Sequence, residues 1–396
     1  MNYILFDSSD RVNLLPFTFT RPSSEVRFGI LTITEKWKRY LNSKVSFLTE
    51  SYLNAKYPLV TSKDNMLING TICPDKIIVE EIANLKMNEA LVINDLLIAA
   101  RVENVEFFSE AEFQGNRVES KSIDFLKITF TYDIFAKNGK ALTTDFEMIT
   151  RGRTSQPLSP TNRVVNPENI FIEEGAVVEF SILNASTGPI YIGTNSEVME
   201  GALVRGPFAL LENATLKLGA KIYGPTTVGP HSKVGGEVNN SVFFSYSNKG
   251  HDGFVGNSVI GEWCNIGADT NTSNLKNTYD EVKLWSYDTK KFEETGLTFC
   301  GLMMGDHSKS GINTMFNTGT VVGVASNVFG AGFPRNFIPS FSWGGSHGFV
   351  THKLEKAFET ALAMRYRRNL DFDEMEKAIL KAVYNETGKY RYWERK

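Results

Sequence analysis

Large aliphatic residues recur at every sixth position through the middle of the chain. Eight of them follow one another in this spacing, and some are followed directly by glycine: Ile192, Val198, Val204, Leu210, Leu216, Ile222, Val228 and Val234. A spacing of six fits neither the helical period of 3.6 residues nor the simple alternation of a strand. It fits a coil of short strands in which one aliphatic residue per strand points to a central axis, so that three hexads make one triangular turn. The pattern therefore predicts a parallel β-helix, whose hand the spacing does not define.

The six-residue pattern is interrupted and resumes, which places the β-helix over residues 166–350. It breaks near residues 239–250, resumes with Ile260 and Ile266, and shifts again to Phe316, Val322 and Val328. Of the 32 glycines, 26 lie between residues 175 and 348. Glycine suits the corners of such a coil because it adopts positive φ without a Cβ clash. An ordinary β-sandwich is the alternative, but its strands would be irregularly spaced.

The first 150 residues mix short aliphatic runs with helical stretches, which predicts an α/β domain of Rossmann-like type. A helix is expected over Ile33–Leu41. The expected strands are Asn2–Phe6, Lys44–Leu48, Asn65–Asn69, Lys76–Val79 and Ala90–Ile93, with a longer strand or hairpin arm over Leu126–Phe135. Residues 151–165 are polar, contain two prolines and show no period, so we expect a linker there.

Residues 351–396 have a helical pattern. Apolar residues at i, i+3, i+4, i+7 and i+8 from Leu354 predict one helix, and a second is expected from Asp371, with Glu374 as its capping partner, to Gly388. Two helices after a solenoid most simply cap its open end, whose strand edges would otherwise invite aggregation.

Composition excludes several classes of protein. Lys and Arg total 42 against 45 for Asp and Glu, so a general nucleic-acid binder is not expected. No apolar run is long enough for a membrane span, and the first residues lack the features of a signal peptide. The three cysteines are scattered without metal-ligand spacing. We therefore expect a cytoplasmic protein with reduced thiols and no structural metal site.

Regular hexads need only aliphatic and small residues, so interruptions are where chemistry is expected. Residues 247–256 place Lys249 and His251 beside glycines, and residues 261–279 hold Asn265, Asn274 and Lys276. Amides and lysines suit a polar, phosphorylated substrate, and a histidine titrates near neutral pH and can accept a proton there. The alternative is a surface histidine in a solvated loop.

The segment 247–279 closely resembles the acetyltransferase part of the bifunctional N-acetylglucosamine-1-phosphate uridyltransferase / glucosamine-1-phosphate acetyltransferase (GlmU-like) family. The spacing of the family pattern is kept from His251 to Asn274, through Val255-Gly256, Ile260-Gly261, Asn265-Ile266-Gly267-Ala268 and Thr270. The resemblance implies a left-handed β-helix, a homotrimer and acetyl-CoA as co-substrate. It also implies that His251 is the catalytic base, with Glu237 as a loosely matched carboxylate nearby.

The same resemblance assigns ligand-binding roles to the other matched residues. Asn265 and Asn274 would hold the sugar, with Lys249 and Lys276 beside them, and the backbone at Ala268 would contact acetyl-CoA. The sequence also departs from the family. Phe254 and Leu275 replace tyrosines, and Asp269 replaces a glycine. The segment 310–312 lacks the family's serine contact to the cofactor.

The first residues resemble a degenerate form of the family's nucleotidyltransferase half. Arg11, Leu15-Pro16, Thr18 and Pro22 match its pattern, whereas Asp7-Ser8-Ser9-Asp10 replaces the glycine-rich phosphate loop, Ser23 replaces a lysine and Thr71 replaces the metal-binding aspartate. Carboxylates in this loop repel a triphosphate. Arg11, Arg21 and Arg27 are expected to form a cationic cluster that holds phosphate, and Mg²⁺ is expected only if this domain is active.

Three functions fit these features. The first is acetyl-CoA-dependent N-acetylation of a hexosamine 1-phosphate in UDP-N-acetylglucosamine biosynthesis, with a first domain that binds or makes a nucleotide sugar. The second is a sugar-1-phosphate nucleotidyltransferase, using UTP or dTTP, whose β-helix only oligomerises it. The third is a non-catalytic sugar-nucleotide sensor. Thr71 and the missing glycines count against the second, and the pattern from His251 to Asn274 favours the first.

Overall fold

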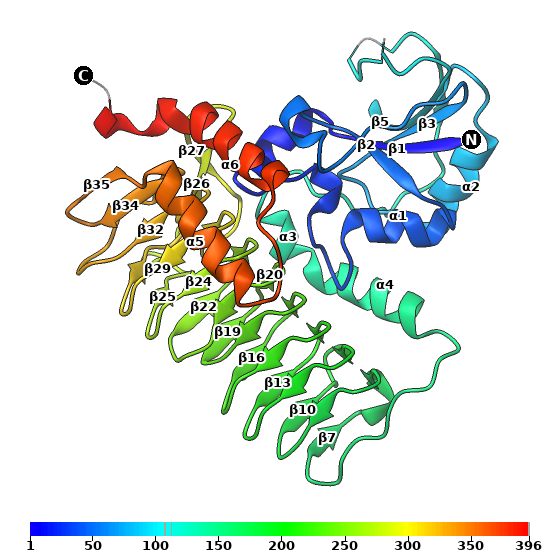
Figure 1. The fold of residues 1–396 in the computed structure, drawn as a ribbon. Coiled ribbons are helices and arrows are strands. Elements are labelled where there is room, and N and C mark those ends of the chain that lie inside the picture. The colour runs from blue at the N-terminus through cyan, green and yellow to red at the C-terminus, as the bar shows by residue number, and fades with distance from the viewer. Residues whose placement is uncertain (107, 112, 395–396) are drawn as a thin grey trace. The chain divides into compact units, whose positions relative to one another are not determined.

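A mixed β-sheet flanked by helices forms the first of two compact units in this computed structural model, which describes residues 1–106, 108–111 and 113–394 (Figure 1). The strand order is β2-β1-β3-β5-β4-β6. The strands are β1 (Asn2–Phe6), β2 (Val45–Leu48), β3 (Asn65–Asn69), β4 (Glu89–Ile93), β5 (Leu96–Val102) and β6 (Asn116–Glu119). Strand β1 pairs in parallel with β2 and β3, whereas β5 runs antiparallel to β3 and β4. The α/β prediction for this part is confirmed.

The helices of this unit begin at local capping residues. Helix α1 (Ile33–Leu41), which matches its prediction, starts with a capping box in which Thr32 accepts from the Glu35 backbone N–H. The segment expected as strand Lys76–Val79 is instead the start of helix α2 (Lys76–Asn84). Its N-cap Asp75 accepts from the Ile78 backbone N–H at 2.8 Å, and only its Ile78 and Ile82 face is buried. That strand prediction was wrong because one cap and one apolar face suffice for a short helix.

One compact unit comprises Met1–Leu14, Thr20–Val26 and Leu31–Phe130, and the other comprises Leu15–Phe19, Arg27–Ile30 and Thr131–Lys396. The strand expected over Leu126–Phe135 is reduced to an isolated bridge at Lys127, followed by helices α3 (Asp133–Ala136) and α4 (Asn138–Thr150). Helix α4 belongs to the second unit because the Asn138 side chain donates to the Pro225 carbonyl at 3.1 Å and to Thr227 at 3.2 Å. No helix or strand lies between Thr150 and Arg163.

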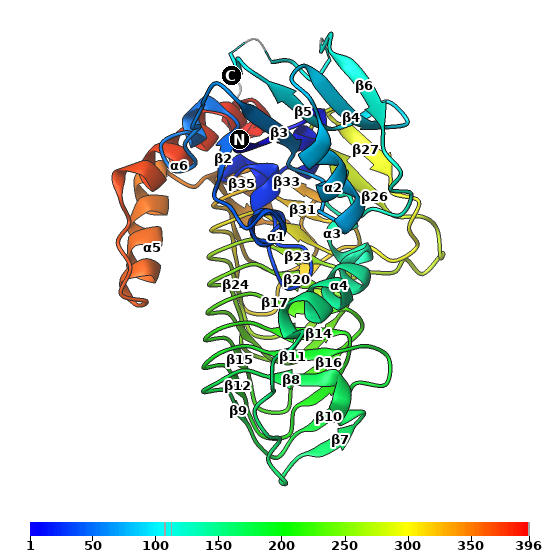
Figure 2. The ribbon, with the colours of Figure 1, turned by 90° about the vertical axis from the view of Figure 1, so that its right-hand side faces the viewer.

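The second unit is a left-handed parallel β-helix, as expected (Figures 1 and 2). Its described strands stack into three faces. The first face contains β7 (Arg163–Val165), β10 (Ile182–Asn184), β13 (Leu203–Arg205), β16 (Lys221–Tyr223), β19 (Glu237–Asn239) and β22 (Phe254–Gly256), with the pair β25 (Asn271–Thr272) and β30 (Met315–Phe316) in contact with β22 through β25. The second contains β8 (Ile170–Ile172), β11 (Ile190–Ile192), β14 (Phe208–Leu210), β17 (Thr226–Val228), β20 (Val242–Phe243), β23 (Val259–Ile260), β28 (Met303–Met304), β31 (Val321–Val322) and β33 (Phe337–Ile338). The third contains β9 (Val177–Val178), β12 (Glu197–Val198), β15 (Thr215–Leu216), β18 (Lys233–Val234), β21 (Asn248–Lys249), β24 (Asn265–Ile266), β29 (Lys309–Ser310), β32 (Asn327–Val328), β34 (Ser342–Gly345) and β35 (Gly348–Thr351).

The six-residue pattern marks the interior of the solenoid. All eight aliphatic residues from Ile192 to Val234 are buried in its core, as are Ile260, Ile266, Phe316, Val322 and Val328. Burial of a large aliphatic side chain contributes about 1.5–3 kcal/mol, and it is repeated here on every strand. The hexads therefore place one inward residue on each face of each coil.

Glycines after the inward residues have a different role from the expected one. Gly193, Gly229 and Gly235 do not adopt positive φ. A Cβ at Gly193 would lie 2.7 Å from the Leu211 carbonyl carbon of the next coil, so these glycines allow close approach between coils. One row of left-handed corners instead holds Asn195, Asn213, His231, Tyr246, Trp263 and His307.

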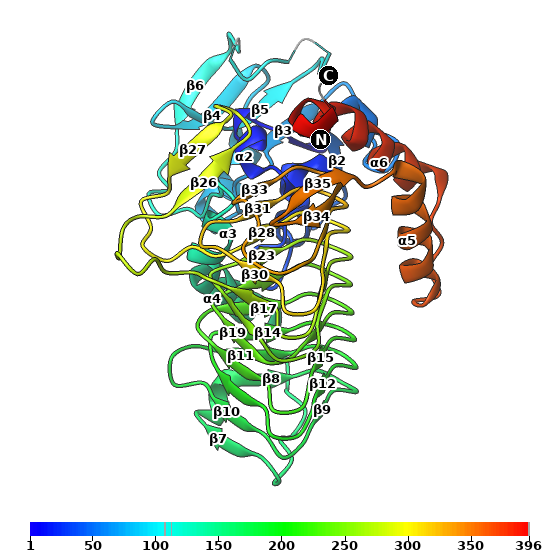
Figure 3. The same ribbon diagram turned by 90° about the vertical axis from the view of Figure 1, so that its left-hand side faces the viewer.

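The second of the two C-terminal helices packs on the last coil of the solenoid, where Tyr384 meets Phe341 edge to face at 5.0 Å, whereas the first runs along its side. Helix α5 (Leu354–Tyr366) runs along the third face, because Arg365 lies over the ring of Trp263 on an earlier coil and Arg368, just beyond the helix, reaches Asn248 (Figure 3). Helix α6 (Glu374–Thr387) begins after N-cap Asp373 rather than at Asp371. The end is closed by the β34–β35 hairpin and by Trp393, which packs on Phe349. In the described ranges, no helix has the length and apolarity needed to cross a lipid bilayer.

Candidate functional site

A row of polar side chains runs along the outer surface of the third face. Lys233, Asn248, Asn265, Lys309 and Asn327 are paired in register on successive coils. Each directly precedes an inward residue and therefore points outward, since strand side chains alternate. Neighbouring coils are about 4.8 Å apart, so these side chains form one continuous row, which we call the polar ladder.

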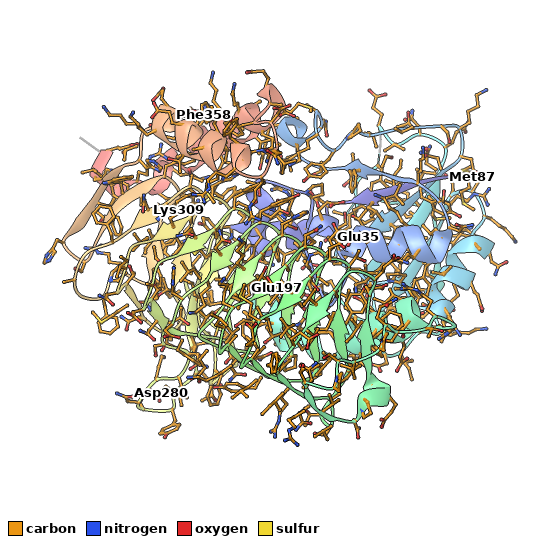
Figure 4. All side chains as sticks on the ribbon, turned by 60° about the horizontal axis from the view of Figure 1, so that its bottom comes forward. Glu35, Met87, Glu197, Asp280, Lys309 and Phe358 are labelled. Carbon is orange, nitrogen blue, oxygen red and sulfur yellow. The ribbon has the colours of Figure 1, made fainter. Side chains whose placement is uncertain are left out.

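A cleft of about 770 Å³ lies between the polar ladder and the end of helix α5. Figure 4 shows Lys309 on this face, along which the helix carrying Phe358 runs. Met364, Arg367 and Arg368 form the helical wall. The other described lining residues are Lys217, Lys233, Tyr246, Asn248, Gly250, His251, Trp263, Asn265, Ile266, Gly267, Ala268, Lys309, Ile312 and Asn327. We call this the ladder cleft.

The ladder cleft is strongly cationic. Its described lining includes Lys217, Lys233, Lys309, Arg367 and Arg368 and contains no Asp or Glu. Burial lowers the pKa of Lys309 to about 8, which still leaves the amine mostly protonated at neutral pH. Cations without neighbouring carboxylates attract and hold phosphate groups. The cleft is therefore suited to a ligand with several negative charges.

An aromatic stack supports the cleft from the adjacent corner. The rings of His231 and Tyr246 are 4.7 Å apart and those of Tyr246 and Trp263 are 4.2 Å apart, nearly parallel in both cases, and His307 continues the stack. The Arg365 guanidinium lies 5.0 Å from the Trp263 ring centre and forms an ion pair with Glu376 at 2.5 Å. The stack therefore gives helix α5 a fixed position beside the ladder.

His251 lies at the rim of the ladder cleft. His251, Ala268 and Ile312 each come two residues after a strand of the third face, on successive coils. His251 is exposed, and its imidazole makes no hydrogen bond within the described parts of the chain. Its ring is therefore accessible to a molecule bound in the cleft. The structure brings together three residues of the sequence motif here: His251, Asn265 and Ala268.

Lys249 lies inside the solenoid rather than in a flexible loop. It occupies the inward position of β21, paired with Val234, and is 1% exposed. Its Nζ donates to the His251 carbonyl at 2.6 Å, and burial lowers its pKa to about 8. The expected substrate contact is not present, because a shortened coil preserves the strand and turns this side chain inward.

The other expected acetyltransferase residues lie outside the described lining of the cleft. Glu237 accepts from the Tyr223 hydroxyl at 2.7 Å. Asn274 donates to the Asn257 side chain at 2.8 Å, and Lys276 donates to a backbone carbonyl at 2.5 Å. The structure therefore does not gather Glu237, Asn274 and Lys276 around His251 within one chain.

Most cationic residues of the cleft were not expected from the sequence. Lys217, Lys233 and Lys309 lie far apart along the chain and converge only because the coils stack in register. A usable signal exists for two of them. Lys233 and Lys309 directly precede inward residues, so the residues before each inward position would have revealed the outward row. Arg367 and Arg368 have no such signal, since their place depends on the docking of α5.

The arginines of the first residues do not form an exposed phosphate site. Arg11 forms ion pairs with Asp7 and Glu50, both at 3.2 Å. Asp7 also accepts from the Ser23 backbone N–H at 2.7 Å, so the loop is held by its own side chains. Arg21 is buried, and Arg27 is buried in the other compact unit, where it donates to the Ile30 carbonyl at 2.5 Å. The expected cationic cluster was therefore wrong.

The same loop does not fit a Mg²⁺ ion. Its carboxylates are engaged, since Asp10 pairs with Lys127 at 2.6 Å and Asp7 with Arg11. Thr71 is buried and its hydroxyl donates to Asn69 at 2.8 Å. Divalent cations need free oxygen ligands. No cluster of three or more potential metal ligands occurs among the residues described.

The first part of the chain matches a known family. Residues 3–154, less than half of the chain, match the family described as sugar nucleotidyl transferase. A segment of 87 residues is 37% identical to the bifunctional protein GlmU of Methanocaldococcus jannaschii and covers 22% of this chain and 21% of that protein. A segment of 143 residues is 26% identical to the uncharacterized acetyltransferase YaiX of an Escherichia coli O6:K15:H31 strain and covers 36% of this chain and 61% of that protein. The resemblance to GlmU-like proteins is confirmed for a divergent relative, and the match spans about a fifth of the M. jannaschii protein.

Similar solved structures include two acyltransferases. The polySia-specific acetyltransferase NeuO is 13% identical with a TM-score of 0.25, over 48% of this chain and 82% of that chain. The Arabidopsis UDP-N-acetylglucosamine acyltransferase is 16% identical with a TM-score of 0.26, over 61% of this chain and 98% of that chain. The fold class rests on the strand topology described above, which is independent of these weak similarities.

Proposed function

We propose that this chain is a transferase of a sugar-nucleotide pathway that moves an acetyl group from acetyl-CoA to the amine of a hexosamine 1-phosphate in the ladder cleft. One observation carries the proposal. The accessible His251 lies at the rim of a cleft whose described lining has five cationic side chains and no carboxylate. Both substrates are phosphorylated, so one cationic cleft suits them. The confirmed resemblance to GlmU-like proteins supports the same reaction class.

In the proposed step, the amine nitrogen of the sugar attacks the carbonyl carbon of the acetyl thioester. A C–N bond forms, the C–S bond breaks, and CoA leaves as the thiolate, which then takes up a proton to become the free thiol. His251 accepts the proton that the nitrogen loses. Asn265, next to Lys309 in the polar ladder, orients the sugar by hydrogen bonds, and the backbone at Ala268 contacts the acetyl end. The lysines and arginines hold phosphate groups.

We further propose that the working enzyme is a homotrimer. Glu237, which matches the family motif only loosely, and Asn274 belong to the first face of the solenoid, where they bond to Tyr223 and Asn257. A neighbouring solenoid in a closed ring would complete a site that one chain leaves open.

The nucleotidyltransferase activity is the second candidate, because residues 3–154 match that family. The ion pairs of Asp7 and Asp10 leave no loop that cradles a triphosphate. In the proposed function this domain binds a nucleotide sugar or has a structural role, and nucleotidyl transfer is weak or absent.

Replacement of His251 tests the mechanism. The variant His251→Ala is expected to lower kcat for acetyl transfer by about 10²–10⁴-fold, the usual contribution of a positioned general base. The KM for the sugar is expected to change little, because a base acts in the transition state. The matched control is His347→Ala, since His347 is also exposed but lies outside the ladder cleft. Parental kcat in His251→Ala would contradict the assigned role.

A further inference from the structure

A second cleft, separate from the ladder cleft, lies beside the inserted hairpin of the β-helix. The hairpin consists of β26 (Lys283–Ser286) and β27 (Lys291–Glu294) and projects from the stacked coils (Figure 3), after a loop whose tip carries Asp280 (Figure 4). The volume of this second cleft is about 720 Å³. The described lining residues are Lys276, Lys283, Trp285, Phe292, Thr318, Arg335, Asn336, Phe337, Pro339, Tyr390 and Tyr392. None of them lines the ladder cleft, and we call this second space the aromatic cleft.

Aromatic rings form a rigid wall of the aromatic cleft. The indole of Trp285 stacks on Phe337 with centres 4.2 Å apart and planes 11° apart. Phe292 meets Trp285 edge to face at 5.5 Å, and Tyr390 meets Phe337 at 5.9 Å. Phe292 and Tyr392 remain 43% and 42% exposed. A planar ligand can stack on the faces of these two exposed rings while the wall keeps its arrangement.

The polar part of the lining is cationic. Lys276, Lys283 and Arg335 lie in the wall, and the described lining contains no carboxylate. Lys283 pairs with Glu294 at 3.2 Å on the hairpin, and both side chains are more than half exposed. Ion pairs this exposed to solvent contribute little to stability, so Lys283 is able to leave Glu294 and pair with a phosphate group of a ligand. The Arg335 guanidinium lies 5.2 Å from the Tyr392 ring centre, next to an exposed ring face.

An unsatisfied donor lies in the same wall. The Nε1–H of Trp285 is buried from solvent and has no acceptor among the described residues. Buried donors in folded proteins are nearly always paired. This nitrogen is closed off from the open space of the cleft. The exposed faces of Phe292 and Tyr392 and the neighbouring cations, rather than this donor, point to a bound molecule.

We propose that the aromatic cleft binds a nucleoside phosphate. The planar base stacks against Phe292 and Tyr392, and the phosphate is held by Arg335 with the two lysines. A neutral sugar fits less well, because the lining has no carboxylate to accept its hydroxyl hydrogens. This site is additional to the acetyl-transfer site and does not depend on His251.

Fluorine NMR of the full chain labelled with 5-fluorotryptophan tests the proposal, with UMP and AMP as probes. Trp285 is assigned by Trp285→Phe, and Trp263 reports on the ladder cleft. Millimolar UMP or AMP is expected to shift the Trp285 resonance, with a smaller response to uridine or inorganic phosphate alone. Arg335→Gln and Phe292→Ser are each expected to raise the apparent Kd by about tenfold, because each removes one charge-assisted or stacking contact.

The control is Arg367→Gln, which removes a cation from the ladder cleft and is expected to leave the Trp285 titration unchanged. A Trp285 resonance that neither nucleotide moves would overturn the proposal. So would a titration that Arg335→Gln and Phe292→Ser leave unchanged, or one that inorganic phosphate reproduces. Loss of acetyl transfer in His251→Ala bears on the other site only, so the two proposals fail separately.

Discussion

Lys249 places an amine in the aliphatic interior of the solenoid, between Val234 and Ile266. Desolvation disfavours its charged form and lowers its pKa to about 8, although Asp252 and Asp269 act in the opposite direction. A single hydrogen bond to the His251 carbonyl compensates only in part. Through this hydrogen bond Lys249 holds the backbone of His251, the proposed base, in place. Burial of the amine lowers the stability of the folded chain.

Lys249→Met is expected to raise the free energy of unfolding by about 1–3 kcal/mol at neutral pH, because an apolar side chain of similar size replaces a buried amine. The folded pKa of about 8 lies below the ordinary value of 10.5. Between these values the unfolded chain binds the extra proton, so this lysine makes stability rise with pH in that window. The advantage of Lys249→Met is therefore largest below pH 8 and disappears near pH 10.5.

Urea unfolding of both proteins at several pH values measures this difference. Lys309, whose pKa burial also lowers to about 8, contributes equally in both proteins and cancels in the comparison. A constant difference from pH 7 to pH 10.5 would show that Lys249 does not titrate as described.

At the scale of elements, Arg365 anchors helix α5, whose end forms a wall of the ladder cleft. Its contacts are the Trp263 ring and the ion pair with Glu376, whose partners are both mostly buried. A pair of this kind is stronger than one exposed to solvent. The wall therefore depends on contacts between α5, α6 and the aromatic stack.

Arg365→Ala is expected to loosen α5 and to raise the KM for acetyl-CoA by about tenfold, as the loss of about 1–2 kcal/mol of binding implies. Hydrogen exchange of residues 354–366 is expected to become faster. Lys356→Ala is the control on the same helix, because its pair with Glu359 is exposed. Equal effects of the two variants would contradict the anchoring role of Arg365.

The elements that the sequence predicted are those defined by residues close together along the chain. The hexads from Ile192 to Val234 predicted the solenoid because every strand repeats one inward position. The motif spacing indicated that His251 and Asn265 lie close together, and both line the ladder cleft because they lie within one stretch of two coils. Their roles stay a prediction. Helix α2 was missed because its cap at Asp75 outweighs a short apolar run. The path of α5 was missed because it depends on a contact between distant residues, Arg365 and Trp263.

At the scale of the whole molecule, the two units differ in whether they contain, among the described residues, an open site with unpaired charged side chains for a phosphorylated ligand. The first unit matches the sugar nucleotidyl transferase family, yet its loop carboxylates are paired with Arg11 and Lys127. The second unit has an open cationic cleft with His251 at its rim. We therefore place the proposed acetyl transfer in the β-helix.

The proposed homotrimer is expected to give a molar mass of about three chains of 44.3 kDa in gel filtration with light scattering. His251→Ala is expected to keep this mass, because the exposed imidazole has no packing role. A strict monomer at micromolar concentration would contradict both the assembly and a site shared between solenoids.

The most direct test of the account is release of free CoA from acetyl-CoA in the presence of a panel of hexosamine 1-phosphates, with pyrophosphate release from UTP and dTTP measured in parallel. The account predicts CoA release with at least one amino sugar phosphate. It also predicts loss of that activity in a Lys233→Gln and Arg367→Gln double variant, and little or no pyrophosphate. Efficient pyrophosphate release with no CoA release from any hexosamine 1-phosphate would contradict it.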